Sequence, residues 1–294
     1  MPEYTSYTGG NYATRYEKAV SDVIRQGSLT GILETPNVNW TGAKTFTERT
    51  LKASGFKPHT RDTGWNQGKV EDAEIPYTLE FDRDIEFFVD QADVDETNEL
   101  LTAGNVTKAF LTQQAIPEMD AYRFSKIATK AITLGQSATE TVSKANIYTK
   151  LKAAFLPIRK YGASNMITFM SSEAMDALEQ AEGFSRSIST EKIADIETRV
   201  TSVDGVKLIE VWDDARFKTA FDFTEGFKET TGTKGLNFMV LSRGSIIAKA
   251  KIASIYLFAP GKHTKGDGWL YQNRLYHDLF VRELAKDGIY ISNK

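Results

Sequence analysis

The chain has 294 residues, of which 41% are hydrophobic and 26% are charged, with a formal net charge of −3. These values are ordinary for a globular protein, and the charge lacks the basic excess of a dedicated nucleic-acid-binding protein. The absence of cysteine excludes disulfides, thiolate catalysis and zinc–cysteine sites. The N-terminus has no apolar signal-peptide core, and no run approaches the ~20 apolar residues of a membrane span. We therefore expect synthesis in the cytoplasm and no membrane partner.

Residues 1–37 are polar and contain glycines and scattered tyrosines (Tyr4, Tyr7, Tyr12, Tyr16). A helix is expected over about 14–26, where apolar residues share one face. Scattered tyrosines provide contact area at low entropic cost, which favours an extended arm that packs on neighbouring molecules. The alternative is a disordered tail, because chain termini commonly fray.

Residues 38–81 predict a long two-stranded hairpin. Apolar residues are spaced among polar ones on both limbs, and the segment between them, about 52–69, is rich in turn-forming residues. The outgoing limb is basic, with Lys44, Arg49, Lys52, Lys57 and Arg61. The returning limb is acidic, with Glu71, Asp72, Glu74 and Glu80. An isolated hairpin is marginally stable in water, so this one needs support from elsewhere. The alternative is a solvated loop whose charges only keep it soluble.

Residues 82–97 predict a strand that leads into a helix. Its apolar residues, Ile85, Phe87, Phe88 and Val89, stand among charged ones, as in a strand with one buried face. The acids Asp90, Asp93, Asp95 and Glu96 suit a helix N-terminus. They lack the central glycine and the spacing of an EF-hand loop, so capping is favoured over calcium binding. We predict no metal site here.

A long helix is predicted over about 96–131, because apolar residues recur at three- and four-residue steps. Phe110 and Tyr122 fall on its apolar side and are expected to be buried. About 30 helical residues would span ~45 Å, the length of a strut. Pro117 removes a backbone donor, which predicts a kink or break near 113–117.

The remainder mixes helices and strands. A helix is expected over 147–158, then a buried strand at 166–170 with Ser171 or Ser172 as the cap of the next helix. A hairpin around Asp204-Gly205 should have Val206, Leu208, Val211 and Trp212 on its apolar side, and 236–242 reads as another buried strand. Strands follow at 251–259 and 269–282. Asp287-Gly288 is expected to form a tight turn before a last strand. This mixture predicts an α+β fold.

Three of these stretches carry a family resemblance: FDRDIEFFVDQADVDET at 81–97, EMDAYRFSKIA at 118–128, and LYHDLFVREL at 275–284 followed by DGIYI. In this order, the chain resembles the major capsid proteins of tailed bacteriophages, which have the Hong Kong 97-type fold. Fold analogy is an associational argument for function.

The resemblance implies an order of parts: an N-terminal arm at 1–37, an extended E-loop hairpin at 38–81, a peripheral domain at 82–145 and 251–282, and an axial domain at 146–250 and 283–294. The long helix becomes the spine helix, with Phe110 and Tyr122 in its core. The E-loop would lie across the adjacent subunit, which places its basic residues in a contact between subunits.

The implied function is that of a structural shell subunit. Pentamers and hexamers would form the icosahedral head of a virion that encloses double-stranded DNA, with a separate scaffolding protein and a portal as further partners. No catalytic residue, cofactor or metal is implied.

Two alternatives stay open. One is the shell protein of an encapsulin-like nanocompartment with the same fold. The other is a soluble α+β hydrolase, in which His277-Asp278 would act as a base with its orienting acid. Neighbouring strand residues point to opposite faces, and no G-x-S-x-G motif supplies a nucleophile, so the second is disfavoured.

Overall fold

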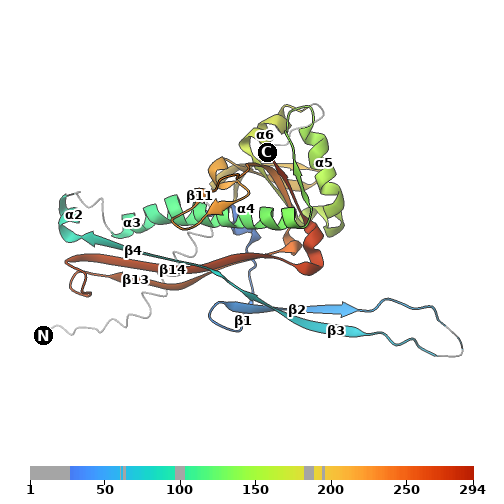
Figure 1. The fold of residues 1–294 in the computed structure, drawn as a ribbon, viewed down its shortest axis with the longest axis horizontal. Helices are drawn as coiled ribbons and strands as arrows, with labels where there is room; N and C mark the ends of the chain where they lie inside the picture. Colours follow the sequence, from blue (N-terminus) through green and yellow to red (C-terminus); the bar gives the residue numbers. More distant parts are fainter. Residues whose placement is uncertain (1–26, 60, 62–63, 97–102, 182–188, 194–195) are drawn as a thin grey trace.

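The computed structural model describes residues 27–59, 61, 64–96, 103–181, 189–193 and 196–294. The helix expected over 14–26, and with it most of the expected arm, lies outside the described residues. In Figure 1 the chain forms a block of sheet and helices, a long helix that runs beside a narrow three-stranded sheet, and a hairpin that projects from the body. The fold is of the α+β type.

The larger sheet has seven strands in the order β5-β15-β12-β6-β9-β8-β7. The strands are β5 (Ser137–Thr139), β6 (Met166–Ser171), β7 (Ser189–Ile193), β8 (Ile196–Val203), β9 (Val206–Val211), β12 (Leu236–Ser242) and β15 (Ile289–Asn293). The β5–β15 and β6–β9 pairs are parallel, and the other pairs are antiparallel.

Helices cover both faces of the larger sheet. One face packs against α5 (Ile147–Ile158) and α6 (Ser172–Glu179), with Phe155 and Met170 in the shared core. The other face packs against α4 (Ile116–Thr133), where Phe124 lies over Phe169 with ring centroids 5.1 Å apart. Because successive strand residues point to opposite faces, Phe169 and Met170 enter different cores.

Local sequence signals explain several boundaries of this sheet. The Ser171 side chain accepts a hydrogen bond from the backbone nitrogen of Ala174 and caps α6 as expected. Asp204 and Gly205 adopt positive φ angles of 53° and 78° in the turn between β8 and β9. The prediction for Trp212 is wrong. This residue follows the last residue of β9 and is exposed, so it does not belong to the apolar side of the hairpin.

The long helix is interrupted as its proline predicts. After α2 (Gln91–Glu96), the described helices are α3 (Ala103–Phe110), a π-helical turn η2 (Leu111–Ala115), and α4. Pro117 lies in the first turn of α4, where its missing N–H costs least. The wider π turn just before it lets the helix continue past the proline ring.

The smaller sheet has the order β13-β14-β4, all antiparallel, with β4 (Phe81–Asp90), β13 (Ile246–Phe258) and β14 (Gly268–Val281). One face of β4 packs toward the long helix, and the other exposes Asp82, Asp84 and Glu86. This alternation corrects the expectation for Phe88, which shares the charged face and contacts His263. Asp90 accepts a hydrogen bond from the nitrogen of Ala92 at 2.9 Å, a capping role.

The connection into β15 also differs from the sequence prediction. A 3₁₀ segment η7 (Glu283–Gly288) replaces the expected tight turn, and Gly288 does not adopt a positive φ. A Cβ at this position would lie 1.8 Å from Oγ of Ser245. Glycine is therefore required for space and not for backbone conformation.

Candidate assembly surfaces

The projecting hairpin consists of β1 (Asn39–Trp40), β2 (Thr45–Ala53) and β3 (Val70–Thr78). β2 and β3 pair in an unbroken antiparallel register from Thr45↔Thr78 to Ala53↔Val70. Figure 1 shows this ribbon leaving the body at the strand ends next to β4. Only its base therefore touches the rest of the chain.

An aromatic cluster fixes the base of the hairpin. Phe46 is 1% exposed and packs with Leu79 and Ile247. Its ring centroid is 5.6 Å from those of Trp40 and Tyr77. Buried aromatic rings dominate the energetics of such clusters, so the base is part of the folded core.

Polar contacts complete this attachment. Nε of Arg282 donates to Oε1 of Glu48 at 2.8 Å. Nζ of Lys251 donates to the carbonyl of Ala43 at 2.6 Å and lies 4.4 Å from the Trp40 ring centroid. These contacts set the direction in which the hairpin leaves the body.

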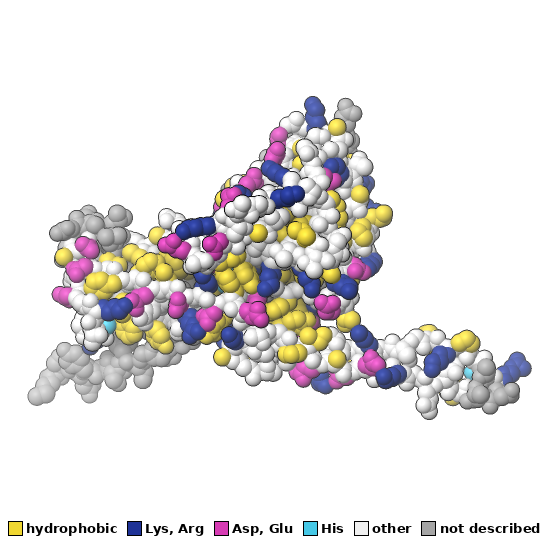
Figure 2. Space-filling view, in the orientation of Figure 1, with side chains coloured by type: hydrophobic (Ala, Val, Ile, Leu, Met, Phe, Trp, Pro, Cys, Tyr) yellow, Lys and Arg dark blue, Asp and Glu magenta, His cyan; other side chains and the backbone are white. Residues whose placement is uncertain are grey.

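The far end of the hairpin has no such support. Trp65 is 96% exposed, Phe56 is fully exposed, and Leu51 and Val70 are largely exposed. The turn is held by its own hydrogen bonds, such as the one from Nδ2 of Asn66 to the carbonyl of Pro58 at 2.8 Å. Figure 2 shows hydrophobic side chains at this end, separated from the body by charged ones. Within the described chain, nothing covers this apolar surface.

All five basic residues predicted to contact another subunit are exposed on the hairpin: Lys44, Arg49, Lys52, Lys57 and Arg61. Arg49 donates from Nη2 to Oδ2 of Asp72 at 2.7 Å, and Lys52 lies opposite Glu71 in the register. Exposed pairs of this kind contribute only about 0–1 kcal/mol. The basic and acidic limbs thus face each other within one chain, and their contact with a second subunit stays a prediction.

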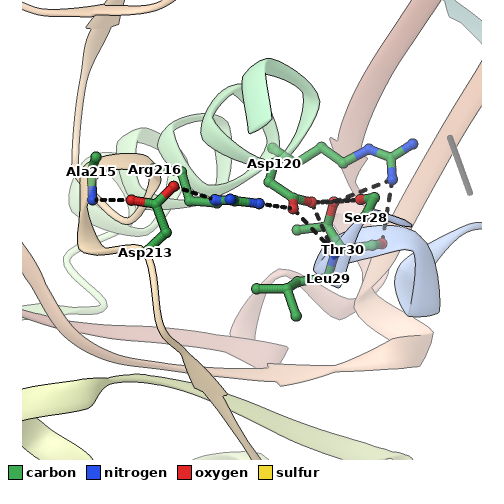
Figure 3. Close-up of polar contacts among 8 residues, drawn as sticks. Ser28, Leu29, Thr30, Asp120, Asp213, Ala215 and Arg216 are labelled. Carbon is green, nitrogen blue, oxygen red and sulfur yellow. Dashed lines mark hydrogen bonds and ion pairs between the residues drawn. The ribbon is translucent and has the colours of Figure 1, made fainter. Parts of the chain in front are cut away.

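A second feature, which the sequence analysis missed, fastens the start of the described chain to α4. The carboxylate of Asp120 is fully buried and accepts four hydrogen bonds from the segment that enters the 3₁₀ helix η1 (Leu29–Leu33). The donors are Oγ of Ser28 at 2.5 Å, Oγ1 of Thr30 at 2.6 Å, and the nitrogens of Thr30 and Leu29 at 3.0 and 3.1 Å. Figure 3 shows this convergence.

Two arginines balance the buried carboxylate. Arg216 lies between Asp213 and Asp120, 2.9 Å and 3.3 Å away respectively (Figure 3). Arg123 is fully buried, and its Nη1 donates to the carbonyl of Thr30 at 3.3 Å. Burial lowers the pKa of Arg123, and the nearby carboxylates of Glu34 and Asp120 oppose that shift. The network fixes the position of Ser28 and η1 against α4.

The two aromatic residues predicted for the helix core differ in burial. Tyr122 is buried, and its hydroxyl donates to Oδ1 of Asp278 at 2.9 Å. Burial and the Asp278 carboxylate raise the pKa of Tyr122 strongly. Phe110 is only half-buried, because it lies at the end of α3 beside a pocket. Its ring packs edge-on against Phe87, with the ring centroids 5.3 Å apart.

The His277-Asp278 pair does not have the geometry of a base and its orienting acid. Asp278 accepts hydrogen bonds from Tyr122 and from the nitrogens of Leu279 and Glu80. Nδ1 of His277 is buried without a hydrogen-bond partner. Among the described residues, no three His, Asp or Glu side chains gather as a metal site would require. No helix in the described ranges is both long and apolar enough to span a membrane.

Neither the protein-family models nor the curated proteins contain a match to this chain. Solved structures do match. A chain of the mature capsid of bacteriophage PhiM1 has a TM-score of 0.61 at 10% identity, covering 92% of this chain and 86% of that one. A chain from Mycobacterium phage Ogopogo has a TM-score of 0.57 at 10% identity, covering 90% and 91%.

A chain of the capsid of cyanophage P-SCSP1u matches with a TM-score of 0.55 at 11% identity, covering 89% of this chain and 86% of that one. The matches extend over nearly the full length of both partners, so they concern the whole architecture and not one sheet. At identities this low the likeness establishes the fold. The chain therefore has the fold of phage capsid proteins, the α+β Hong Kong 97-type fold that its sequence resemblance implied.

Proposed function

We propose that this chain is a major capsid protein, a structural subunit that assembles with copies of itself into the head shell of a tailed phage. The observation that carries the proposal is the hairpin, which projects from a phage capsid fold with an uncovered apolar end. Exposed aromatic residues far from a chain's own core are typical of a surface that another protein covers. In a shell of identical copies, that protein is a second subunit.

Each part of the fold can be assigned to one of the expected domains. We assign the axial role to the seven-stranded sheet, which includes β5 within the range expected for the peripheral domain. The peripheral role goes to the long helix and the three-stranded sheet, whose β13 begins at Ile246, within the range expected for the axial domain. The hairpin is the E-loop, and residues 1–37 are the arm, of which the described part is fastened to α4 by the Asp120 network.

The exposed basic residues of the hairpin, Lys44, Lys52, Lys57 and Arg61, would meet acidic surface on the neighbouring subunit. Such pairs select partners and set their alignment more than they add affinity. The assembled pentamers and hexamers would enclose double-stranded DNA without reading its sequence, and a scaffolding protein and a portal would take part in assembly. The mature location would be the virion.

The test is a deletion of residues 54–68 with a two-residue Asn-Gly turn in their place. The shortened chain should stay folded and soluble, because every described residue of this segment is exposed. It should fail to form particles in size-exclusion chromatography and negative-stain microscopy. Particles of normal yield and stability would contradict the proposed role of the hairpin.

A matched pair of double substitutions separates apolar contact from mere chain length. Phe56→Ser with Trp65→Ser should abolish particles, whereas His59→Ser with Gln67→Ser at the same end should leave most of them. Wild-type protein that stays monomeric or dimeric under all assembly conditions would contradict the shell function itself.

A further inference from the structure

Residues 218–235 connect β9 to β12 through a two-stranded excursion, which we call the clasp. Along it, β10 (Phe221–Asp222) pairs with β11 (Lys228–Glu229) in an antiparallel register. Figure 1 shows β11 beside α4, and the tip of the clasp, residues 223–227, contacts both α4 and β4. The clasp therefore joins the larger sheet to the long helix and to the smaller sheet.

One side chain of the smaller sheet holds the tip in place. Arg83 of β4 donates from Nη1 to the carbonyl of Phe223 at 2.7 Å and, more loosely, from Nη2 to the carbonyl of Gly226 at 3.5 Å. Its Nε donates to Oε1 of Glu118 on α4 at 2.7 Å. The planar guanidinium thus binds β4, α4 and the clasp together, with a geometry that a lysine ammonium does not offer.

Beneath the tip, a group of aromatic rings leads down to His277. Phe223 packs edge-on against Phe81 and Tyr122, with ring centroids 5.2 Å and 5.5 Å away. These two rings are stacked on each other, and His277 packs edge-on against them at 4.8 Å and 5.2 Å. His277 is 2% exposed, and its Nδ1 is buried without a hydrogen-bond partner. The clasp thus closes one end of this group, and a titratable ring lies at the other.

The clasp lies between two cavities. A pocket of about 290 Å³ is lined by Gly226 of the tip together with Arg83 and His277. A second pocket, of about 590 Å³, is lined by Phe221 and Phe223. The tip therefore has free space on both sides. A segment with few packed neighbours opens at a lower cost than the core does.

The charges around His277 disfavour a proton on its ring while the clasp is closed. The titratable and charged side chains around it lie on three elements: Arg83 and Asp84 on β4, Glu118, Tyr122, Arg123 and Lys126 on α4, and Asp278 next to it on β14. The clasp and β13 face it with uncharged Phe223, Gly226 and Ala250. Burial, with the positive charges of Arg123 and Arg83, lowers the pKa of His277 well below its ordinary value.

Opening the clasp would reverse two of these causes. Water would reach the aromatic group and the imidazole beneath it, which reduces the cost of burying a charge. Arg83 would lose its two carbonyl partners and could turn away from His277. The open clasp would therefore bind a proton at His277 more tightly than the closed clasp.

We propose that the clasp is a pH-sensitive latch, closed while His277 is neutral and opened when this ring takes up a proton. Proton binding and opening are linked, so each favours the other. Opening would expose Phe81 and Tyr122, which the tip covers in the closed state. This inference is separate from the proposed function, because every part of the latch belongs to one chain.

The test measures the position of the tip in the unassembled full-length chain. The sequence has no cysteine, so Gln113→Cys on η2 and Glu225→Cys on the tip, both at exposed positions, carry the only two spin labels. Double electron–electron resonance should show a single label-to-label distance at about pH 7.5. A second, longer distance should appear reversibly at about pH 5, where an accessible histidine is protonated. Far-UV circular dichroism should not change, because the rest of the chain stays folded.

Substitutions in the labelled chain separate the trigger from the lock. His277→Gln should keep the single distance at both pH values, because the titrating ring is gone. Arg83→Gln should show the longer distance at both, because the tip loses its anchor. Arg274→Gln is the matched control. It breaks an arginine–carboxylate pair with Asp82 on the other face of the same sheet and should leave the wild-type response intact.

Proton nuclear magnetic resonance gives a second readout on the ring itself. The chain has only three histidines, so His59 and His263 serve as internal references in each spectrum. Phe223→Ser loosens the tip without changing any charge. His277 should titrate at a higher pH in this variant than in the wild type, whereas the two references should titrate as before.

Four results would each overturn the proposal. They are one distance at both pH values in the wild type, a pH response that persists in His277→Gln, an unchanged His277 titration in Phe223→Ser, or a longer distance that appears only when circular dichroism reports unfolding. None of them depends on whether particles form, so they leave the shell function untouched.

Discussion

The hairpin and α4 are both long elements, but they differ in how far the rest of the chain buries their side chains. From Ile116 to Ser125, nearly every residue of α4 is buried, including the charged Asp120 and Arg123. In the hairpin, burial is confined to the base and fades along the ribbon. The side chains of the helix are thus buried by residues of the same chain. The side chains of the hairpin are buried at its base alone, which is why we assign its far end to a contact between chains.

The largest expected effect lies in the helix. Asp120→Asn should lower the free energy of unfolding by about 3–5 kcal/mol, because it breaks the ion pair of the buried carboxylate with Arg216 and removes one of the two carboxylates near buried Arg123. It also places an amide where four donors converge. Chemical denaturation measures the change. The matched control is Asp213→Asn on the exposed side of Arg216, which should cost about 1 kcal/mol. Equal losses would show that the buried carboxylate of Asp120 contributes no more to stability than the partly exposed carboxylate of Asp213.

The next prediction contrasts the two ends of the hairpin. Phe46→Ala at the base should cost about 3–5 kcal/mol, because a buried ring leaves a cavity. Phe56→Ala at the far end should change the stability of the single chain by less than about 0.5 kcal/mol. Denaturation of unassembled protein measures both. A large loss from Phe56→Ala would mean that the far end folds back on its own chain and would break the comparison.

A smaller effect concerns pH and His277, whose ring packs edge-on against the stacked pair Phe81 and Tyr122. Its pKa is lowered in the folded chain, so the unfolded chain binds a proton first as the pH falls. Stability should therefore drop below about pH 6.5, by up to about 1.4 kcal/mol per pH unit.

His277→Gln should make stability less dependent on pH between roughly pH 7 and 5, because the unfolded chain then takes up about one proton fewer than in the wild type. Denaturation at several pH values measures the change. His59→Gln at the exposed end of the hairpin is the control and should keep the wild-type slope. An unchanged slope in His277→Gln would mean that other groups cause the pH dependence.

The smallest expected effect is the Arg49–Asp72 pair on the hairpin. A double-mutant cycle with alanine should give a coupling of about 0–1 kcal/mol in the unassembled chain, because both side chains are exposed. The coupling should shrink further at 1 M salt, where the Debye length is only ~3 Å. A coupling above about 2 kcal/mol would show that the hairpin is held rigid by its own charges.

Sequence patterns predicted the elements whose apolar periodicity reflects a single buried face. The strand at Leu236–Ser242, the Ser171 cap and the irregular π turn before Pro117 all follow from local chemistry. The sequence did not show which end of the hairpin is buried, because large apolar residues occur at the base (Phe46, Tyr77) and at the far end (Phe56, Trp65) alike.

The remaining features depend on partners that are distant in sequence. Asp120 binds Thr30 from 90 positions away, and nothing near Asp120 in the sequence marks it as buried. Because α4 is covered on nearly all sides, its polar positions are buried too, and a periodicity that separates apolar from polar faces cannot identify them. The role of Gly288 likewise depends on Ser245, which approaches it from another loop.

The pairing of β4 with β14 has a consequence for the time course of folding. Glu80 and Asp278, joined by a hydrogen bond where the hairpin meets this sheet, are 198 residues apart, and six of the seven strands of the larger sheet are encoded between them. Closing so long a loop is entropically costly before the intervening sheet has folded. The hairpin base should therefore form late, and an incompletely folded chain would not yet present its far end in the orientation that a neighbour could recognise.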